Sequence, residues 1–158
     1  MKMIYPFLKS QLKLYLDKVN IDHNKLTIQG IDLKSGSVNT DNFMTNFFKY
    51  KYYFQGAIYQ KGLEMYRDEK YPGYTILPFK FIFLPTFNIN NPKTFVLTDK
   101  WINAAWNGFK TNSGYEYKGI IELVKDIEWH IVNQVFNESK EFHLNDEVDL
   151  DDSFIHNI

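Results

Sequence analysis

A group of polar side chains near the start of the chain has residue types and spacing suited to phosphodiester hydrolysis. Asp17 ends one stretch of alternating apolar and polar residues, and Asp32 and Lys34 end the next. Magnesium-dependent phosphodiesterases need such groups, because Mg²⁺ prefers a few carboxylate oxygens and keeps several waters. The two carboxylates are therefore candidate metal ligands, and the backbone carbonyl of Leu33 is a third.

The lysine and two later residues complete this candidate site. Lys34 lies two residues after Asp32, so both side chains project from one face of a strand. There the amine can orient or deprotonate an attacking water, or stabilise charge on phosphorus. Gln55 and Tyr59 are four residues apart on a predicted helix and share one face. Gly56 predicts a close approach of that helix to the sheet or to a bound strand.

The candidate carboxylates fall on a predicted β-hairpin over residues 11–34. Apolar residues alternate from 11 to 21 with a one-residue slip at Asp17, which predicts one strand with a bulge. Residues 22–25 have turn chemistry, and residues 26–34 form the returning strand. Gly30 in that strand indicates a bulge or a close approach by another element.

The rest of the chain predicts helices mixed with short strands. The expected elements are a short helix near 40–48, a longer helix at 52–67, a turn at 71–74, strands at 79–84 and 94–97, a helix at 99–108 and a last helix at 117–136. This order favours an α/β (α+β) fold in which helices pack against a mixed sheet.

Composition limits the classes of protein to consider. The 158 residues, 44% of them apolar, suffice for one domain with a core. No apolar run approaches the roughly 18 residues of a membrane span, and no signal peptide opens the chain, so we expect a cytoplasmic protein without a membrane partner. The absence of cysteine excludes disulfides and thiolate metal sites. The four histidines are too scattered for a zinc motif.

Charge is distributed unevenly along the chain. Residues 1–61 carry nine lysines and four aspartates, a net +5, whereas residues 122–158 carry two lysines and ten acidic residues, a net −8. The candidate site lies in the basic part, as a phosphate-backbone ligand would favour, although ordinary solvated lysines explain the charge equally well. Residues 138–158 are predicted as an acidic tail, either frayed or partner-binding.

Three segments, in this order, resemble the PD-(D/E)XK nuclease superfamily, and most closely its RecB-like branch, which includes phage recombination exonucleases. The segments are Leu16–Val19, Gly30–Ser35 and Tyr53–Tyr59. The resemblance covers roughly residues 9–98 and implies a restriction-endonuclease-like mixed β-sheet flanked by helices, within a domain spanning residues 1–137. It also implies that Asp17 and Asp32 bind the metal.

The resemblance implies further roles and a function. Lys34 would be the catalytic lysine, and Gln55 and Tyr59 would support the site or the DNA. The expected activity is that of a DNA nuclease, with exonuclease action as the favoured mode, using Mg²⁺ or Mn²⁺ in recombination or repair and encoded by a phage. Relatives include ring-forming oligomers, so a homo-oligomer or a recombination partner protein is compatible with it.

The chain departs from the family at its start, and a second function remains open. Relatives usually carry helices before the first catalytic aspartate, often with another acidic or histidine ligand. Only sixteen residues precede Asp17 here, and none is Asp, Glu or His, so a shortened N-terminus is expected. The alternative is an inactive nuclease-like fold that binds DNA or protein.

The sequence also leaves open the role of an aromatic and basic segment at the start of the longer helix. Its members could stack bases and hold phosphates of a single strand, or they could belong to the core and its rim. They are Lys49, Tyr50, Lys51, Tyr52, Tyr53 and Phe54.

Overall fold

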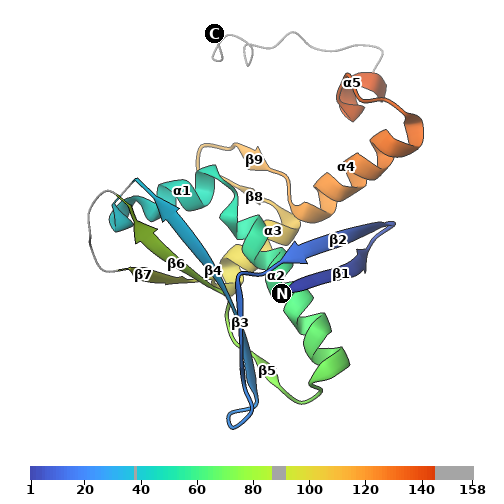
Figure 1. The fold of residues 1–158 in the computed structure, drawn as a ribbon. Coiled ribbons are helices and arrows are strands. Elements are labelled where there is room, and N and C mark those ends of the chain that lie inside the picture. Colours follow the sequence, from blue (N-terminus) through green and yellow to red (C-terminus); the bar gives the residue numbers. More distant parts are fainter. Residues whose placement is uncertain (38, 87–91, 145–158) are drawn as a thin grey trace.

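The structure is a computed structural model that describes residues 1–37, 39–86 and 92–144 (Figure 1). The strands are β1 (Lys2–Phe7), β2 (Ser10–Tyr15), β3 (Lys18–Asp22), β4 (Thr27–Gly36), β5 (Thr75–Ile76), β6 (Lys80–Pro85), β7 (Lys93–Val96), β8 (Phe109–Lys110) and β9 (Glu116–Tyr117). The helices are η1 (Thr40–Asn42, a 3₁₀ turn), α1 (Phe43–Lys49), α2 (Tyr52–Lys70), α3 (Asp99–Asn107), α4 (Ile120–Asn133) and α5 (Lys140–Leu144).

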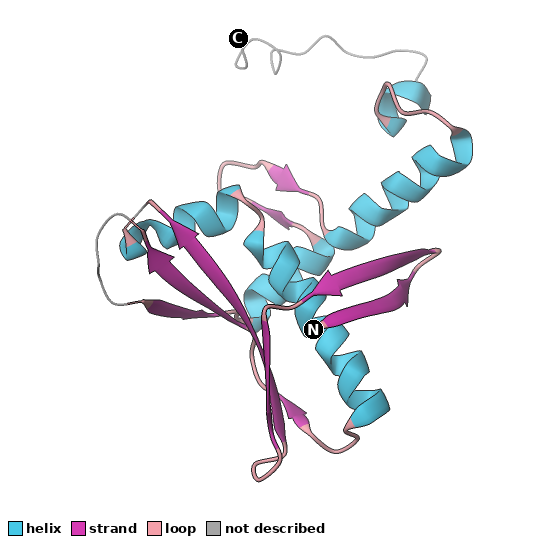
Figure 2. Ribbon diagram, viewed as in Figure 1, coloured by secondary structure: helices cyan, strands magenta, loops and turns pink. Residues whose placement is uncertain are grey.

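A mixed sheet forms the centre of the fold (Figure 2). Its strands run in the order β3-β4-β6-β7, and the short β5 also pairs with β4. β4 is antiparallel to β3 but parallel to β6, and β6 is antiparallel to β7. A parallel pair needs a long crossover, which α1 and α2 provide between β4 and β6. The predicted α+β fold with helices against a mixed sheet is confirmed.

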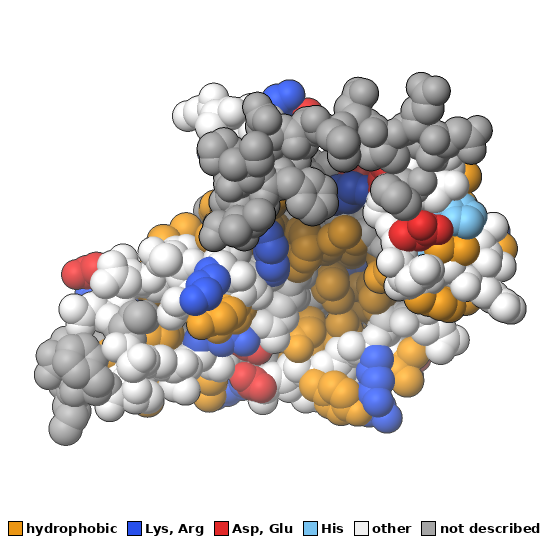
Figure 3. All heavy atoms as spheres, turned by 90° about the horizontal axis from the view of Figure 1, so that it is seen from above, with side chains coloured by type: hydrophobic (Ala, Val, Ile, Leu, Met, Phe, Trp, Pro, Cys, Tyr) orange, Lys and Arg blue, Asp and Glu red, His pale blue; other side chains and the backbone are white. Residues whose placement is uncertain are grey.

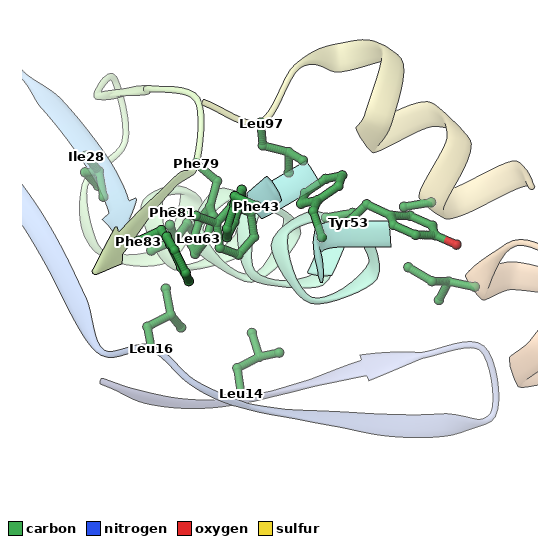
Figure 4. Packing of buried hydrophobic residues seen from close by; sticks show 14 of the residues in the cluster. Leu14, Leu16, Ile28, Phe43, Tyr53, Leu63, Phe79, Phe81, Phe83 and Leu97 are labelled. Atoms are coloured by element: carbon green, nitrogen blue, oxygen red, sulfur yellow. The ribbon is translucent and has the colours of Figure 1, made fainter. Parts of the chain in front are cut away.

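One face of this sheet and the helices enclose an aromatic core. Alternate residues of β6, Phe81 and Phe83, are almost fully buried, as the two-residue period of a strand requires. Figure 4 shows these rings beside Phe43 of α1, and Tyr53 of α2 belongs to the same buried cluster. The apolar side chains on the opposite face, among them Leu33 of β4, are more exposed. The buried face therefore fixes which side of β4 meets the helices.

Two glycines let α2 lie close to the sheet. A Cβ atom at Gly30 would lie 2.6 Å from side-chain atoms of Leu63 and Phe79. At Gly56 it would lie 2.8 Å from Leu97 Cδ2 and 3.0 Å from the Phe81 ring. Distances this short exclude a larger side chain unless its neighbours shift. The close approaches predicted at both glycines are confirmed, and they set the distance between α2 and β4.

The N-terminal third corrects one prediction. Residues 11–21 are not one bulged strand but two strands in different sheets, because β2 pairs with β1 and β3 pairs with β4. The chain leaves the first sheet at Leu16, whose backbone N–H donates to Met1 O at 2.8 Å. The terminal ammonium of Met1 donates to Leu16 O at 2.6 Å in return. The one-residue slip at Asp17 is this passage between sheets, and the hairpin itself comprises β3 and β4.

The C-terminal part differs from the sequence-based expectation in its helix boundaries. The last predicted helix begins at Ile120, not Tyr117, because residues 116–117 form β9 and pair with β8. Gly119 lies so close to Gly108 that a Cβ atom there would overlap the Gly108 nitrogen. In the predicted acidic tail, residues 140–144 form α5, while residues 145–158 lie outside the described residues.

α4 and α5 project away from the body that carries the sheet (Figure 1). Viewed from above, apolar side chains form the floor of a hollow, with lysine side chains near its edge (Figure 3). Within the described part of the chain, no helix is long and apolar enough to cross a bilayer.

Candidate active site

The predicted site residues come together where β3, β4 and α2 meet. The β3–β4 register pairs Lys18 with Ile31, so the residue that precedes β3, Asp17, lies beside the position of Asp32. Asp17 Oδ2 accepts a hydrogen bond of 2.9 Å from the backbone N–H of Leu33. This bond fixes the Asp17 carboxylate against the edge of β4, next to the second predicted ligand.

Asp32, Lys34 and Gln55 form a closed network between β4 and α2. Lys34 Nζ lies 2.7 Å from Asp32 Oδ2 and donates to Gln55 Oε1 at 2.8 Å. Gln55 Nε2 donates to Asp32 Oδ1 at 3.2 Å. Because Gln55 contacts both charged groups through opposite ends of its amide, it sets the position of each relative to the helix.

Two tyrosines of α2 flank this network. Tyr59 OH accepts from Gln55 Nε2 at 3.1 Å, and the Tyr59 ring packs edge-on against Phe79. The Tyr52 ring lies 4.5 Å from Lys34 Nζ, within range of a cation–π interaction. The sequence did not single out Tyr52 as a site residue. Its spacing, three residues before Gln55 on the same helix face, is the signal that could have found it.

The electrostatics of the site centre on Asp32. Its side chain is 4% exposed, and burial raises its pKa above the usual value. The ion pair with Lys34 lowers the pKa, whereas the charge of Asp17 raises it, and the net direction is upward. Oδ2 is buried, and the described residues offer it no partner besides the Lys34 ammonium. The Lys34 ammonium is therefore the group that balances the charge of this buried oxygen.

The possible metal ligands are few. Among the described residues, no three His, Asp or Glu side chains gather at one point. Asp17 and Asp32 remain, together with the main chain of Leu33, whose N–H points towards Asp17. The N–H and C=O of a strand residue face the same edge, so we expect the Leu33 carbonyl on that side as well. Mg²⁺ is commonly held by one or two carboxylates and several waters, so this set fits Mg²⁺ or Mn²⁺ better than zinc.

The site lies at the edge of the sheet, apart from the wide groove of the molecule. That groove, of about 850 Å³, lies between β1 and the second half of α2 and is lined in part by Met3, Met65 and Tyr66. Neither candidate carboxylate contributes to its lining.

The structure thus brings together all of the residues predicted for the site: Asp17, Asp32, Leu33, Lys34, Gln55 and Tyr59. Their roles in metal binding and catalysis stay predictions. Comparisons of the chain with models of protein families, with curated proteins and with solved structures found no match.

Proposed function

We propose that this protein is a DNA nuclease that hydrolyses phosphodiester bonds with Mg²⁺ or Mn²⁺. The observation that carries the proposal is the hydrogen-bonded cluster of Asp32, Lys34 and Gln55 between β4 and α2, with Asp17 bonded to the backbone of Leu33 beside it. Asp17 precedes β3, Asp32 and Lys34 lie on β4, and Gln55 lies on α2, in the order that the resemblance to PD-(D/E)XK nucleases implies. If the Asp-x-Lys sequence had arisen by chance, there would be no reason for a glutamine to contact both of its charged side chains, as Gln55 does.

In this proposal each residue has a separate task. Asp17 and Asp32 would hold the cation together with the carbonyl of Leu33. A cation held there would offset the phosphate charge and lower the pKa of an attacking water. Lys34 orients that water or stabilises the charge that develops on phosphorus. Gln55 anchors Lys34 through Oε1, so the amine keeps a partner when a metal competes with it for Asp32.

The biological setting is part of the proposal and follows from the same resemblance. We place the enzyme in DNA recombination or repair, in the cytoplasm of a bacterial or phage-infected cell, with exonuclease action as the expected mode. The net +5 of residues 1–61, which contain the whole candidate site except for surrounding core residues, favours a polyanionic substrate.

A second function is favoured by one specific observation. Lys34 and Gln55 both pair with Asp32, and the described residues provide two carboxylates but no third acidic or histidine side chain at this point. Such a network can be a structural ion pair. The alternative is therefore a catalytically inactive nuclease-like fold that binds DNA or protein.

The two functions differ in a cleavage assay. The full-length protein is incubated with linear and with closed circular DNA, in Mg²⁺, in Mn²⁺ and in chelator. The nuclease function predicts cleavage only with metal, and a preference for linear DNA if the enzyme is an exonuclease. Asp32→Asn and Lys34→Gln should each lower the rate by about a hundredfold or more, as expected for loss of a metal ligand or an acid–base group.

Matched controls come from α2. Asp68→Asn and Lys61→Gln remove charges from exposed ion pairs with Arg67 and Glu64, and should leave the rate unchanged. Cleavage that survives substitution of both Asp32 and Lys34 contradicts the assigned site. DNA that is retained without metal and never cut favours the binding function.

A further inference from the structure

The structure divides the aromatic residues at the α1–α2 junction into two groups. Tyr53 is fully buried, and Phe54 packs against the same core. Tyr50 is 54% exposed, whereas Tyr52 is half-buried beside Lys34. Tyr53 is therefore a core residue, whereas Phe54 and Tyr52 are both half-buried and pack against the core. Of these two, Tyr52 is the one whose ring contacts a residue of the candidate site, Lys34.

Tyr52 and Tyr50 make a continuous aromatic path outward from the candidate site. The Tyr52 ring lies 4.5 Å from Lys34 Nζ on one side, and its centroid is 5.7 Å from that of Tyr50 at an interplanar angle of 31°. Core rings hold Tyr52 in place, because it stacks on Phe43 and Phe81, each with centroids 6.1 Å away. The path is therefore positioned before any ligand arrives.

Lysines accompany these rings and lack carboxylate partners. Lys49 Nζ lies 5.4 Å from the centroid of the Tyr50 ring, and Lys51 Nζ lies 4.5 Å from that of Tyr117 on β9. Within the part of the chain that the structure describes, neither lysine forms an ion pair, although Lys34, Lys61 and others do. An exposed ring with an unneutralised ammonium above it suits a nucleotide, which offers a flat base and a phosphate.

We propose that Tyr50, Tyr52 and Lys49 form a subsite for single-stranded DNA that continues directly from Lys34. A base stacks on Tyr50, its phosphate lies near Lys49, and Tyr52 keeps the strand aligned with the Asp32–Lys34 network. The subsite rests on the proposed nuclease function for its role in orienting the strand. Bases in a duplex are stacked on one another, so only a single strand can offer a base to Tyr50.

The test measures DNA binding without cleavage. Full-length Asp32→Asn protein, in chelator, is titrated into a fluorescently labelled single strand of about 12 nucleotides, within the usual size range of such sites, and into the same sequence as a duplex. Tyr50→Ala should weaken single-strand binding about tenfold, the size of one lost base–aromatic stack, and leave duplex binding unchanged. Tyr50→Phe keeps the ring and should bind like the parent protein.

The lysine is tested by salt dependence, with controls on α4. Lys49→Ala should make the slope of log affinity against log salt shallower by about 0.7, the value for one phosphate contact with a single strand. Phe136→Ala and Lys125→Ala should change neither affinity nor slope, because both residues are exposed and lie on or after the projecting helix (Figure 1). Thermal melting confirms that each variant is folded.

The outcomes separate the subsite from the nuclease function. Equal affinities for Tyr50→Ala and Phe136→Ala overturn the subsite, as does an equal loss on single strand and duplex. The wild-type protein, which retains Asp32, is assayed for metal-dependent cleavage in parallel. If it cleaves but Tyr50→Ala binds normally, only the subsite is wrong. If it never cleaves but Tyr50 still controls single-strand binding, the subsite stands as a binding site and the nuclease function fails.

Discussion

Asp32 is a deeply buried carboxylate whose negative charge is only partly stabilised by neighbouring groups. Its side chain is 4% exposed, yet Lys34 Nζ and Gln55 Nε2 both contact its oxygens. Burial nevertheless keeps its pKa above the usual 3.8, and the nearby Asp17 carboxylate adds to this effect. Burial therefore penalises the charged form of Asp32, and the Lys34 ammonium offsets only part of that penalty.

The raised pKa of Asp32 predicts how stability depends on pH. The folded protein binds the proton more tightly than the unfolded chain, so this group contributes stability that is fully present below pH 3.8 and is lost as pH rises through the folded-state pKa. The amide of an Asp32→Asn variant cannot ionise and avoids that loss. The free energy of unfolding of Asp32→Asn should therefore rise relative to wild type as pH increases above 3.8. Urea unfolding in chelator measures this difference, and a constant difference contradicts the prediction.

Two substitutions can separate the structural role of Asp17 from its proposed role as a metal ligand. Its Oδ2 accepts the Leu33 N–H, which an asparagine oxygen can also do, but an alanine cannot. Asp17→Asn should therefore keep wild-type stability, whereas Asp17→Ala should lose about 1 kcal/mol. Both should lose metal-dependent cleavage, because both remove the charge. Denaturant unfolding and the cleavage rate are measured together, and full activity in Asp17→Asn argues against a metal ligand here.

Residue types and spacing were enough to predict the site but not all of its parts. Asp32, Lys34, Gln55 and Tyr59 follow from the strand and helix periods, which place each pair on one face. Tyr52 was not predicted as a site residue, because its contact with Lys34 depends on how α2 lies across β4. That arrangement is set by tertiary packing at the glycines, which no local pattern reports.

At the scale of elements, the site depends on how closely α2 approaches β4. Gln55 spans the gap, with bonds of 2.8 Å to Lys34 and 3.2 Å to Asp32, so a small movement of the helix would break one of them. Gly30 permits the short distance, because a Cβ there would meet Leu63 of α2, and Gly56 lets the same helix lie close to Phe81 of β6. Gly30 therefore affects both the packing of the core and the geometry of the network.

A methyl group at Gly30 should disturb both. In Gly30→Ala the new Cβ would lie 2.6 Å from buried atoms of Leu63 and Phe79, and the overpacking should cost about 1–3 kcal/mol of stability. Gly36→Ala, on the same strand, is the matched control, because its nearest neighbour is 3.3 Å away, and its loss should be smaller. Thermal and urea unfolding measure the loss of stability in both variants. Equal losses would contradict the prediction, because they would show that α2 can move away from β4 to accommodate the methyl group.

Long elements were predicted well, whereas short ones depended on contacts that a local pattern does not report. α1, α2, β6, β7 and α3 lie where periodicity and turn residues predicted them. β8 and β9 are two residues each, too short for a period to register, and their pairing displaced the expected start of α4. The alternation over residues 11–21 was real, but it could not reveal that the strand changes sheets at Asp17.

Across the whole molecule, the sheet separates a covered face from an open one. Asp32 and Lys34 lie on the face that meets α2, at the end of the β3–β4 pair, while Leu33 between them is 60% exposed on the other. The candidate site thus lies on the covered face, with the core behind it, where the Asp32 side chain is 4% and the Lys34 side chain 17% exposed.

The most direct measurement of the central claim is the rate at which linear DNA is cleaved in saturating Mg²⁺ by wild type, Asp32→Asn and Asp68→Asn. Asp32 is buried in the network, whereas the side chain of Asp68 is 66% exposed and pairs with Arg67. The nuclease function predicts a wild-type rate for Asp68→Asn and a loss of about a hundredfold or more for Asp32→Asn. Equal rates for the two variants, or no metal-dependent cleavage by wild type, would contradict it.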